Sequence, residues 1–268
     1  MGSELAGFIK ERQAHNVRSL VQDAGIQPKL AIIKTIDNPV IDLYVRLKQA
    51  YATDIGIAVD VYRASQQEVP NLLVSLNRDD SVHGIIIQLP LEDVSQTDEL
   101  VNMVDPAKDV DALGEKAKFD PATPMAILWL LSGFNVDLQG KEVVLVGRGK
   151  LVGKPLERML LDSGIDVRVA DRSTKDVTAL TKEADVIITA TGQPAILTSA
   201  MVKSGAVVVD AGVASENGKT VGDVDPELFN REDITITPQK GGVGPLTICA
   251  LFDNVIRAAE RKRAVEAP

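Results

Sequence analysis

The chain has few aromatic residues and almost no cysteine, and these scarcities exclude several classes of protein. Only 3% of its 268 residues are Phe, Trp or Tyr, which leaves few rings for stacking against nucleic-acid bases. The single cysteine, Cys249, cannot form a disulfide within the chain, so we expect a reducing compartment, the cytoplasm. Cysteines paired at metal-binding spacing are absent, and we predict no metal site.

Positive charge is in deficit, and the chain opens without a long apolar run. The 29 Lys and Arg are outnumbered by 38 Asp and Glu, for a net charge of -9. Such a protein has no broad basic surface to neutralise a phosphate backbone, so we expect no nucleic-acid partner. Charges interrupt the opening sequence MGSELAGFIKERQ, which is therefore neither a secretory core nor a membrane span. We expect no membrane association.

The N-terminal half alternates between helix and strand patterns. The 268 residues suggest two domains, since domains typically contain about 100–200 residues. Helical spacing of apolar residues predicts an opening helix from Leu5 to Val21. Strands at 30–36, 56–62 and 82–87 then alternate with a helix at 39–52 and one carrying Val69, Leu72, Leu73 and Leu76. The run at 82–87 is almost wholly apolar, which is typical of a parallel sheet buried on both faces.

After Leu138 the pattern restarts with five short strands, each ending at a turn or a glycine. Their sequences are KEVVLV, DVRVADR, DVIITATG, AVVVDAG and ITITP. Together they predict an open α/β sheet of the Rossmann, dinucleotide-binding type. The fold class is therefore α/β with two domains, an N-terminal one over 1–123 and a Rossmann-type one over 124–244. A last helix from about Pro245 could return to either domain.

A glycine-rich turn follows the first of these strands. Gly147, Gly149 and Gly153 lie between VVLV and the helical segment LERMLLDSG. Glycines permit positive φ and close backbone approach, and a helix start attracts a pyrophosphate. The spacing G-x-G-x-x-x-G is one residue longer than the usual fingerprint, so a plain turn without a ligand is the alternative.

Charged residues near this turn bear on the choice of cofactor. Asp171 ends the next strand, where an acid commonly binds the ribose hydroxyls of NAD. Arg148 and Arg172 flank that place, and two guanidiniums suit the 2′-phosphate of NADP. The alternative is that all three are solvated turn charges.

Polar residues of the N-terminal half form a second candidate site. Tyr44 and Lys48 are four apart on a predicted helix and share one face, although an exposed pair of this kind is commonly a surface contact. Gln88 ends a predicted parallel strand, where ligands collect. Asp109 and Asp111 follow in a loop, and a loop rim is their alternative reading.

The segment 238–247 packs three glycines and two prolines between a strand and a helix. Such a loop folds tightly against a ligand, and we include Gly242 and Pro245 among the substrate-binding residues. An interdomain hinge is the alternative.

Seven segments in order resemble the bifunctional methylenetetrahydrofolate dehydrogenase/cyclohydrolase family, over nearly the whole chain. They are YVRLK, IIIQLPL, KDVDALG, PATP, GRGKLVGKP, ITP and GGVGPLT. The resemblance implies two α/β domains with a cleft between them, and a nicotinamide cofactor on the C-terminal domain. Because Arg148 and Arg172 together outweigh Asp171, we expect that cofactor to be NADP, with NAD as the alternative. It also implies tetrahydrofolate derivatives as substrates, and a homodimer in which the helix 245–268 joins the N-terminal domain.

The resemblance also implies roles for individual residues. Lys48 would be essential for cyclohydrolysis with Gln88 as its partner, Tyr44 would stack on the folate, and Asp111 would anchor the pterin. An ammonium in a partly desolvated cleft has a lowered pKa and can exchange a proton near the reacting carbon. Hydride transfer needs no acid or base and depends on positioning.

The chain departs from the family pattern at several positions. Gly149 replaces Ser, and Asp171 stands where His is usual, both beside the expected cofactor phosphate. Ile36 and Ile41 replace Gly and Ser near the helix of Tyr44, and Ala112 replaces the Gly after the pterin-binding Asp. The wall of the folate site has therefore changed.

We expect an enzyme that oxidises methylene-tetrahydrofolate to methenyl-tetrahydrofolate with NADP and hydrolyses the product to formyl-tetrahydrofolate. One alternative is a dehydrogenase of the same family with lost or weakened cyclohydrolysis. Another is a catalytically silent dinucleotide-binding regulatory protein. The chain has all four of the expected site residues, which argues against a catalytically silent protein. They are Tyr44, Lys48, Gln88 and Asp111.

Overall fold

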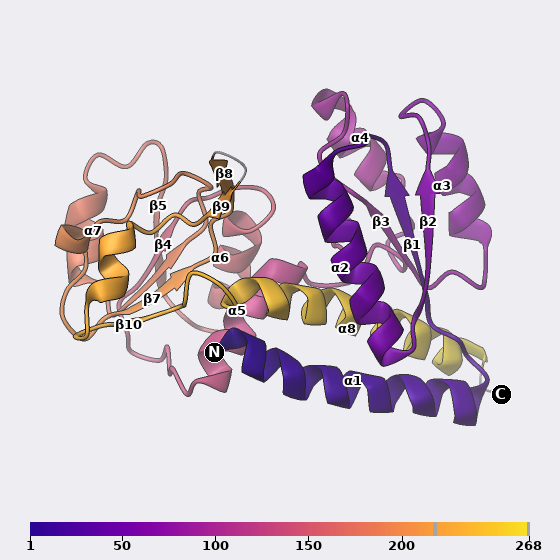
Figure 1. The fold of residues 1–268 in the computed structure, drawn as a ribbon, viewed down its shortest axis with the longest axis horizontal. Helices are drawn as coiled ribbons and strands as arrows, with labels where there is room; N and C mark the ends of the chain where they lie inside the picture. The colour runs from indigo at the N-terminus through magenta and orange to yellow at the C-terminus, as the bar shows by residue number, and fades with distance from the viewer. Residues whose placement is uncertain (217–218, 267–268) are drawn as a thin grey trace. The chain divides into compact units, whose positions relative to one another are not determined.

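The chain folds into two compact α/β units in the computed structural model, which describes residues 1–216 and 219–266 (Figure 1). The N-terminal unit comprises Gly7–Ala122 and Ile248–Pro268, and the C-terminal unit comprises Met1–Ala6 and Thr123–Thr247. Helices α1 (Gly2–Ala24) and α8 (Val243–Glu266) each contribute residues to both. Both units contain parallel sheets, as the sequence predicted.

The N-terminal unit contains a three-stranded sheet with the order β2-β1-β3. Strand β1 (Lys29–Lys34) is central and pairs in parallel with β2 (Ala58–Arg63) and β3 (Gly84–Ile87). Because parallel neighbours need crossover connections, helices link these strands. Helix α2 (Pro39–Ile55) links β1 to β2, and α3 (Val69–Arg78) links β2 to β3. The short 3-10 helix η1 (Val94–Gln96) and α4 (Thr97–Asn102) follow β3.

Capping residues set the ends of α2 and correct one predicted boundary. The Asn38 side chain accepts a hydrogen bond from the Val40 amide at 2.8 Å, and Pro39 occupies the first turn. Gly56 ends the helix in the left-handed region with φ 81°. The strand predicted from Gly56 therefore begins only at Ala58. The strand predicted over 30–36 likewise ends earlier, at Lys34.

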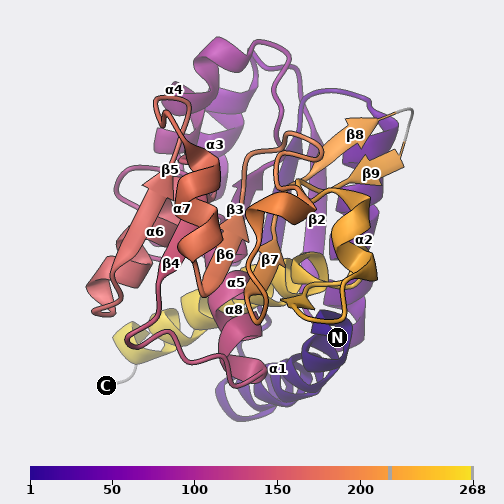
Figure 2. The ribbon, with the colours of Figure 1, turned by 90° about the vertical axis from the view of Figure 1, so that its left-hand side faces the viewer.

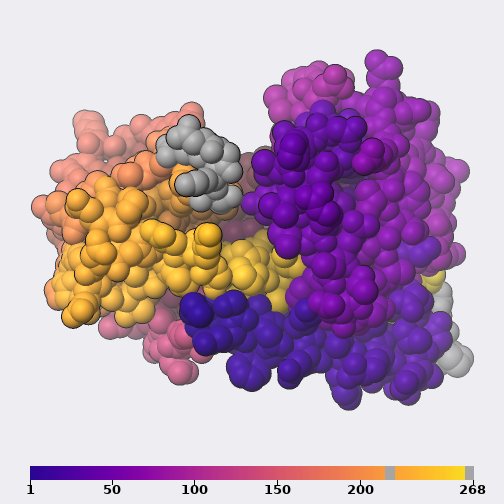
Figure 3. Space-filling model, viewed as in Figure 1, coloured from indigo at the N-terminus to yellow at the C-terminus, as the bar shows by residue number. Residues whose placement is uncertain are grey.

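Helix α1 confirms the amphipathic opening helix and extends it in both directions. Its buried residues include Val17 and Leu20, whereas Phe8 on the opposite face is 72% exposed. Figure 3 draws the atoms of this helix in indigo, at the surface of the protein. Within the described part of the chain, no helix has the length and apolar character needed to cross a membrane.

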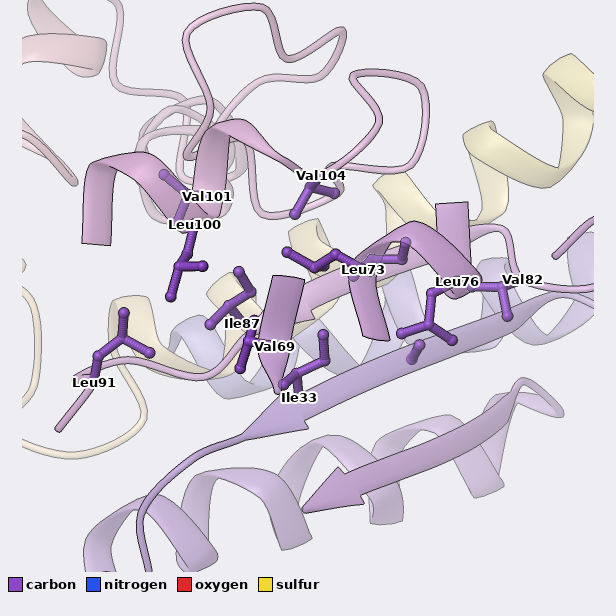
Figure 4. Packing of buried hydrophobic residues seen from close by; sticks show 12 residues of the cluster. Ile33, Val69, Leu73, Leu76, Val82, Ile87, Leu91, Leu100, Val101 and Val104 are labelled. Carbon is purple, nitrogen blue, oxygen red and sulfur yellow. The ribbon is translucent and has the colours of Figure 1, made fainter. Parts of the chain in front are cut away.

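One face of the β1 sheet packs against α3 and α4 in a continuous apolar cluster (Figure 4). Leu73 of α3 is fully buried there, with Ile33 of β1 and Ile87 of β3 in the same cluster. Val104, which follows α4, is also a member. The helical spacing of 69, 73 and 76 produces this contact, because these positions share one face of α3.

The C-terminal unit contains a five-stranded parallel sheet with the order β10-β7-β6-β4-β5. Figure 2 shows β7, β6, β4 and β5 side by side, and β10 is labelled in Figure 1. Its strands are β4 (Val143–Val146), β5 (Val167–Ala170), β6 (Val186–Thr189), β7 (Val207–Asp210) and β10 (Thr235–Ile236). Its helices are α5 (Ala122–Gly133), α6 (Gly153–Asp162), α7 (Val177–Glu183), and the 3-10 helices η2 (Ser199–Met201) and η3 (Pro226–Asn230). All five predicted strands are present.

An antiparallel hairpin of β8 (Ala214–Glu216) and β9 (Lys219–Val221) was not predicted. Each strand has three residues, too few to show an alternating pattern in the sequence.

We expect Leu73→Ala to lower the free energy of unfolding of the N-terminal unit by about 2–5 kcal/mol, because it opens a cavity in a packed core. Urea denaturation followed by circular dichroism measures the loss. Val74 is the neighbouring residue at 44% exposure, and Val74→Ala should change stability by less than about 0.5 kcal/mol. Equal effects of the two substitutions would contradict the assigned core.

Candidate functional site

Both sheets contain a point where successive connections leave in opposite directions along the sheet. From β1 the chain continues to β2 on one side, and then returns to β3 on the other. From β4 it continues to β5, and then returns to β6. In open parallel sheets, ligands bind outside the carboxyl ends of the two strands at such a point. The carboxyl ends of β1 and β3, and those of β4 and β6, are therefore the places to search.

At the first of these points the structure brings Lys48 and Gln88 together. The Lys48 Nζ, presented by α2, donates a hydrogen bond to Gln88 Oε1 at 2.7 Å. Gln88 directly follows β3, and its amide donates to the Ile33 carbonyl oxygen at 2.8 Å, continuing the ladder with β1. Both side chains are half-buried. The rigid backbone at the end of the sheet thus fixes the acceptor that orients the ammonium.

Burial and a neighbouring carboxylate act on Lys48 in opposite senses. Desolvation lowers the pKa of Lys48, and the carboxylate of Asp111 partly opposes that shift. Asp111 shows the mirror image, because burial raises its pKa and the Lys48 ammonium opposes the rise. Lys48 thus loses its proton at a lower pH than an exposed lysine, with a carboxylate close enough to interact electrostatically.

Tyr44 lies one turn before Lys48 on α2 and is 37% exposed, so its ring is accessible to a ligand. Nearby, Lys34 ends the apolar strand β1 and is only 4% exposed. Its ammonium is paired with Asp37 at 2.7 Å and with Asp42 in the first turn of α2. The hydrogen bonds that the Lys34 ammonium donates to these carboxylates, that to Asp37 first, raise the pKa of Lys34. This ion cluster ties α2 to the end of β1.

The two loop aspartates occupy different environments. Asp109 is buried at 3% exposure, and its carboxylate accepts hydrogen bonds from the amides of Gly114 at 2.8 Å and Leu113 at 3.4 Å. Burial raises the pKa of Asp109 to about 6. Its backbone bridges to Ile85 of β3. The alternative of a loop rim is therefore wrong for Asp109, which holds the loop closed, while Asp111 is half-buried beside Lys48.

Ala112 adopts a backbone conformation that suits glycine. Its φ is 56°, in the left-handed region where a Cβ is sterically unfavourable. Alanine in place of the glycine of the family pattern therefore puts a Cβ where the backbone conformation disfavours one. The strain lies directly beside Asp111.

At the second point the glycine turn lies between β4 and α6, as expected. Gly147 has φ 106°, and a Cβ there would lie 2.6 Å from the Ala190 carbonyl oxygen. A Cβ at Gly153 would lie 2.1 Å from the Gly147 carbonyl oxygen, so only glycine allows α6 to start so close to the turn. A Cβ at Gly149 would meet nothing within 4 Å. The absence of serine there therefore reflects no lack of space.

The charged residues near this turn are held by partners within the unit. Arg148 donates to Glu157 of α6 from Nε at 2.7 Å and from Nη2 at 3.1 Å. Asp171 directly follows β5, and its Oδ1 accepts from the Ser173 amide at 2.8 Å and from Ser173 Oγ at 2.6 Å. The serine hydrogen bonds lower the pKa of Asp171, and Arg148 adds a smaller effect of the same sign. Arg172 is exposed.

The predicted loop over 238–247 is shorter than expected. Helix α8 begins at Val243, so Gly244 and Pro245 belong to its first turn rather than to a loop. Gly242 ends the loop, and a Cβ there would lie 3.3 Å from the Pro238 carbonyl oxygen. Proline is tolerated in a first helical turn because the N–H group that it lacks would make no hydrogen bond within the helix there.

Glu157 and Lys34 were missed by sequence reasoning, which had weak signals for both. Glu157 lies four residues after Gly153 on the helix that the turn opens. Lys34 is a charge at the end of a continuous apolar strand. No group of three or more His, Cys, Asp or Glu side chains suited to a metal ion occurs among residues 1–216 and 219–266.

Comparison with known proteins agrees with this geometry. The catalytic domain of tetrahydrofolate dehydrogenase/cyclohydrolase matches residues 1–111, and the NAD(P)-binding domain of the same family matches residues 121–263. The bifunctional protein FolD of Lactobacillus acidophilus is 38% identical, over 99% of this chain and 98% of that protein.

Two solved structures show the same fold. The bifunctional FolD enzyme of Campylobacter jejuni has a TM-score of 0.91 at 38% identity, covering 97% of this chain and 98% of that one. The Trypanosoma brucei dehydrogenase-cyclohydrolase, complexed with NADP and an inhibitor, has a TM-score of 0.90 at 28% identity, covering 99% and 97%.

A glycine turn on one parallel sheet and a half-buried, desolvated lysine on the other define an enzyme with a dinucleotide-binding domain. The chain belongs to the tetrahydrofolate dehydrogenase/cyclohydrolase family. The resemblance noted in the sequence is thereby confirmed.

We expect Ala112→Gly to raise the free energy of unfolding by about 0.5–1 kcal/mol, because glycine adopts positive φ without strain. Urea denaturation measures the change. The matched control is Ala50→Gly on the exposed face of α2, which should instead lower stability by about 1 kcal/mol. A loss of stability in both variants would show that Ala112 is unstrained.

Proposed function

We propose that this protein catalyses two successive reactions on tetrahydrofolate derivatives. It oxidises methylene-tetrahydrofolate to methenyl-tetrahydrofolate with NADP, and it hydrolyses the product to formyl-tetrahydrofolate. The relatives that cover the chain end to end are bifunctional FolD proteins. The observation that carries the proposal is the 2.7 Å hydrogen bond between Lys48 and Gln88, beside Asp111, at the carboxyl ends of β1 and β3.

The glycine turn fits a dinucleotide. Its backbone at Gly147 and Gly153 has room for no side chain, and it opens a helix whose N-terminus favours phosphate. NADP, when bound, supplies the hydride acceptor. Gly147, Arg148, Gly149, Gly153 and Arg172 would hold it, with Asp171 acting against the 2′-phosphate. The residues of this chain serve the oxidation by positioning, because hydride transfer needs no acid or base.

Cyclohydrolysis does require proton transfer. A water molecule adds to the methenyl carbon, one carbon–nitrogen bond then breaks, and the reaction releases one proton with the formyl product. Lys48 has a pKa below that of an exposed lysine, so it exchanges protons with the reacting groups near neutral pH more readily. Gln88 orients the Lys48 ammonium by accepting its hydrogen bond. In this proposal Tyr44 stacks on the folate and Asp111 accepts hydrogen bonds from the pterin.

Three finer points extend the proposal. The N-terminal unit binds the folate, and the C-terminal unit binds NADP. Gly242 and Pro245 contribute to substrate binding. The protein acts as a homodimer in the cytoplasm, in keeping with its single cysteine and the family resemblance.

The proposal is tested by replacing Lys48. Lys48→Met should lower the rate of methenyl-tetrahydrofolate hydrolysis at least about 100-fold, because it removes the proton-exchanging group. Lys48→Arg should lower the hydrolysis rate as well, since a guanidinium keeps the charge but does not release its proton. In the parent enzyme the hydrolysis rate should rise with pH until the lowered pKa of Lys48 is passed.

The control is Lys182→Met, which removes an exposed lysine of α7 and should leave both rates unchanged. Oxidation of methylene-tetrahydrofolate is measured in the same preparations by NADPH absorbance. Hydrolysis at the parental rate in Lys48→Met would refute the assignment of Lys48. A parent enzyme that oxidises without hydrolysing would be a dehydrogenase only, and one with neither activity would be a silent member of the family.

Cofactor choice gives a further prediction. The lowered pKa of Asp171 keeps its carboxylate ionised, so it repels a 2′-phosphate. Asp171→Ser should raise the ratio of kcat/KM for NADP over NAD by about fivefold, the scale of a screened surface contact near 1 kcal/mol. Arg148→Ala should lower that ratio. Asp166→Ser, at the opposite end of β5, is the charge-matched control and should change nothing. An unchanged ratio in Asp171→Ser would place the 2′-phosphate elsewhere.

A further inference from the structure

Two aspartates lie at the carboxyl edge of the five-stranded sheet. Asp210 is the last residue of β7, and Asp223 follows β9. Asp223 has no exposed surface, and its Oδ1 has no hydrogen-bond partner. Burial raises the pKa of Asp223, hydrogen bonds from Thr191 oppose that rise in part, and the neighbouring Asp210 carboxylate adds to it. Burying a carboxyl group with one oxygen unpaired costs free energy, so we expect such a side chain to serve a role.

Most hydrogen bonds of this pair come from the backbone of the loops around it, and Thr189 Oγ1 of β6 also donates to Asp210 Oδ1 at 3.3 Å. Asp210 Oδ1 accepts from the amides of Gly212 and Asp223, both at 3.0 Å, and its Oδ2 accepts from the Val224 amide at 3.2 Å. Asp210 therefore holds Asp223 in place. Asp223 Oδ2 in turn accepts from the Thr191 amide at 2.6 Å.

Glycines make room for both carboxyl groups. A Cβ at Gly212 would lie 2.0 Å from the Asp223 Cγ, and a Cβ at Gly222 would lie 2.0 Å from the Asp210 Oδ2. Neither glycine has a positive φ in the left-handed region, so space rather than backbone conformation requires glycine here. The loops after β7 and β9 are built closely around the two side chains.

Thr191 connects Asp223 to the glycine turn. It follows β6, the strand that shares the ligand-binding point with β4. A Cβ at Gly147 would lie 2.6 Å from the Ala190 carbonyl oxygen and 3.0 Å from the Thr191 Cγ2. The segment 190–191 is thus one wall of the turn that we assign to the dinucleotide. The position of that wall depends on what its backbone amide binds.

We infer that Asp223 is a positioning residue for NADP, which sets the Thr191 segment against the glycine turn through its 2.6 Å hydrogen bond to the Thr191 amide. The inference rests on the proposed function, since it assumes that the turn binds NADP. Asp223 acts through the backbone and is assigned no contact with the cofactor. Asp210 and the two glycines keep its carboxyl group in the required place.

Two substitutions of Asp223 separate positioning from general stabilisation. Asp223→Asn keeps an oxygen that accepts from Thr191, and its amide group can donate toward Asp210. Asp223→Leu has the same number and branching of side-chain heavy atoms, although its methyl groups are larger than the carboxylate oxygens, and it leaves the Thr191 amide unpaired. We expect the leucine variant to raise the Kd for NADP by about tenfold or more, the scale of one unsatisfied buried group, and the asparagine variant to stay within about threefold of the parent.

Gly212→Ala provides a second route to the same displacement if the leucine variant does not fold. Its Cβ would push the Asp223 carboxyl aside without removing it, and NADP binding should weaken in the same way. The matched control is Asp225→Asn, which alters the side chain that caps η3 in the same segment. This control should leave the Kd for NADP unchanged.

The experiment combines three readouts on the full chain. Calorimetric titration with NADP gives Kd, hydrogen exchange of the Thr191 amide is followed without cofactor, and methenyl-tetrahydrofolate hydrolysis is measured without cofactor. In Asp223→Leu and Gly212→Ala we expect faster Thr191 exchange and weaker NADP binding. We expect the hydrolysis rate to stay within about twofold of the parent, because Lys48 and Gln88 belong to the other unit.

Faster Thr191 exchange with an unchanged Kd would overturn the inference, as would equal losses in Asp223→Asn and Asp223→Leu. An equal loss in Asp225→Asn would also overturn it, since any damage to the segment would then suffice. A parent protein that does not bind NADP would instead refute the proposed function, and the exchange of Thr191 would still report whether Asp223 fixes that amide.

Discussion

Parallel strand pairing on both sides of one central strand is the constraint on which the two candidate sites depend. Because β1 pairs in parallel with β2 and β3, and β4 with β5 and β6, the strands of each unit end at one edge of its sheet. The connections diverge at that edge and leave room for a ligand. Lys48, Gln88 and the glycine turn are functional candidates because the chain returns to these edges.

Each edge contains a polar group that is removed from water and held by a specific partner. On the N-terminal unit, Lys48 is desolvated yet retains a neutral acceptor in Gln88 and a carboxylate in Asp111. On the C-terminal unit, Asp223 is fully buried and bound to the Thr191 amide. In both cases burial shifts the pKa away from its ordinary value and a hydrogen bond fixes the direction of the side chain. Burying each polar group costs free energy, but it also fixes the orientation of the side chain, and binding and catalysis require a fixed orientation.

The departures from the family pattern differ in physical weight. Gly149 has open space at its Cβ, so glycine and serine are both sterically acceptable there. Ala112 is different, because its φ of 56° strains the backbone next to Asp111. Ile41 is buried in the N-terminal unit at 4% exposure, where a branched side chain adds apolar packing beneath α2. The ion cluster of Lys34 with Asp37 and Asp42 ties that helix to β1.

Local pattern was sufficient for most elements and insufficient at their ends. The short runs at 82–87 and 143–146 predicted buried strands correctly, because they are rich in Ile and Val and each leads to a turn residue, Pro90 or Gly147. The ends were less accurate where a single residue decides them. Gly56 reads as the start of a strand but caps α2, and Pro245 reads as part of a loop but lies in the first turn of α8. Cap geometry of this kind depends on φ and on hydrogen bonds that composition does not contain.

The sequence by itself determined the α/β class, the glycine turn and the family, because each depends on residues close together in the chain or on motifs in a fixed order. Tertiary structure alone decided which polar residues meet. Lys48 and Gln88 are 40 positions apart, and Asp223 and Thr191 are 32 apart, so only the folded sheet brings them within hydrogen-bond distance. It also separated the roles of Asp109 and Asp111, which look alike in the sequence. Burial, rather than residue type, makes that difference, because the Asp109 carboxylate accepts hydrogen bonds from backbone amides whereas Asp111 interacts electrostatically with Lys48.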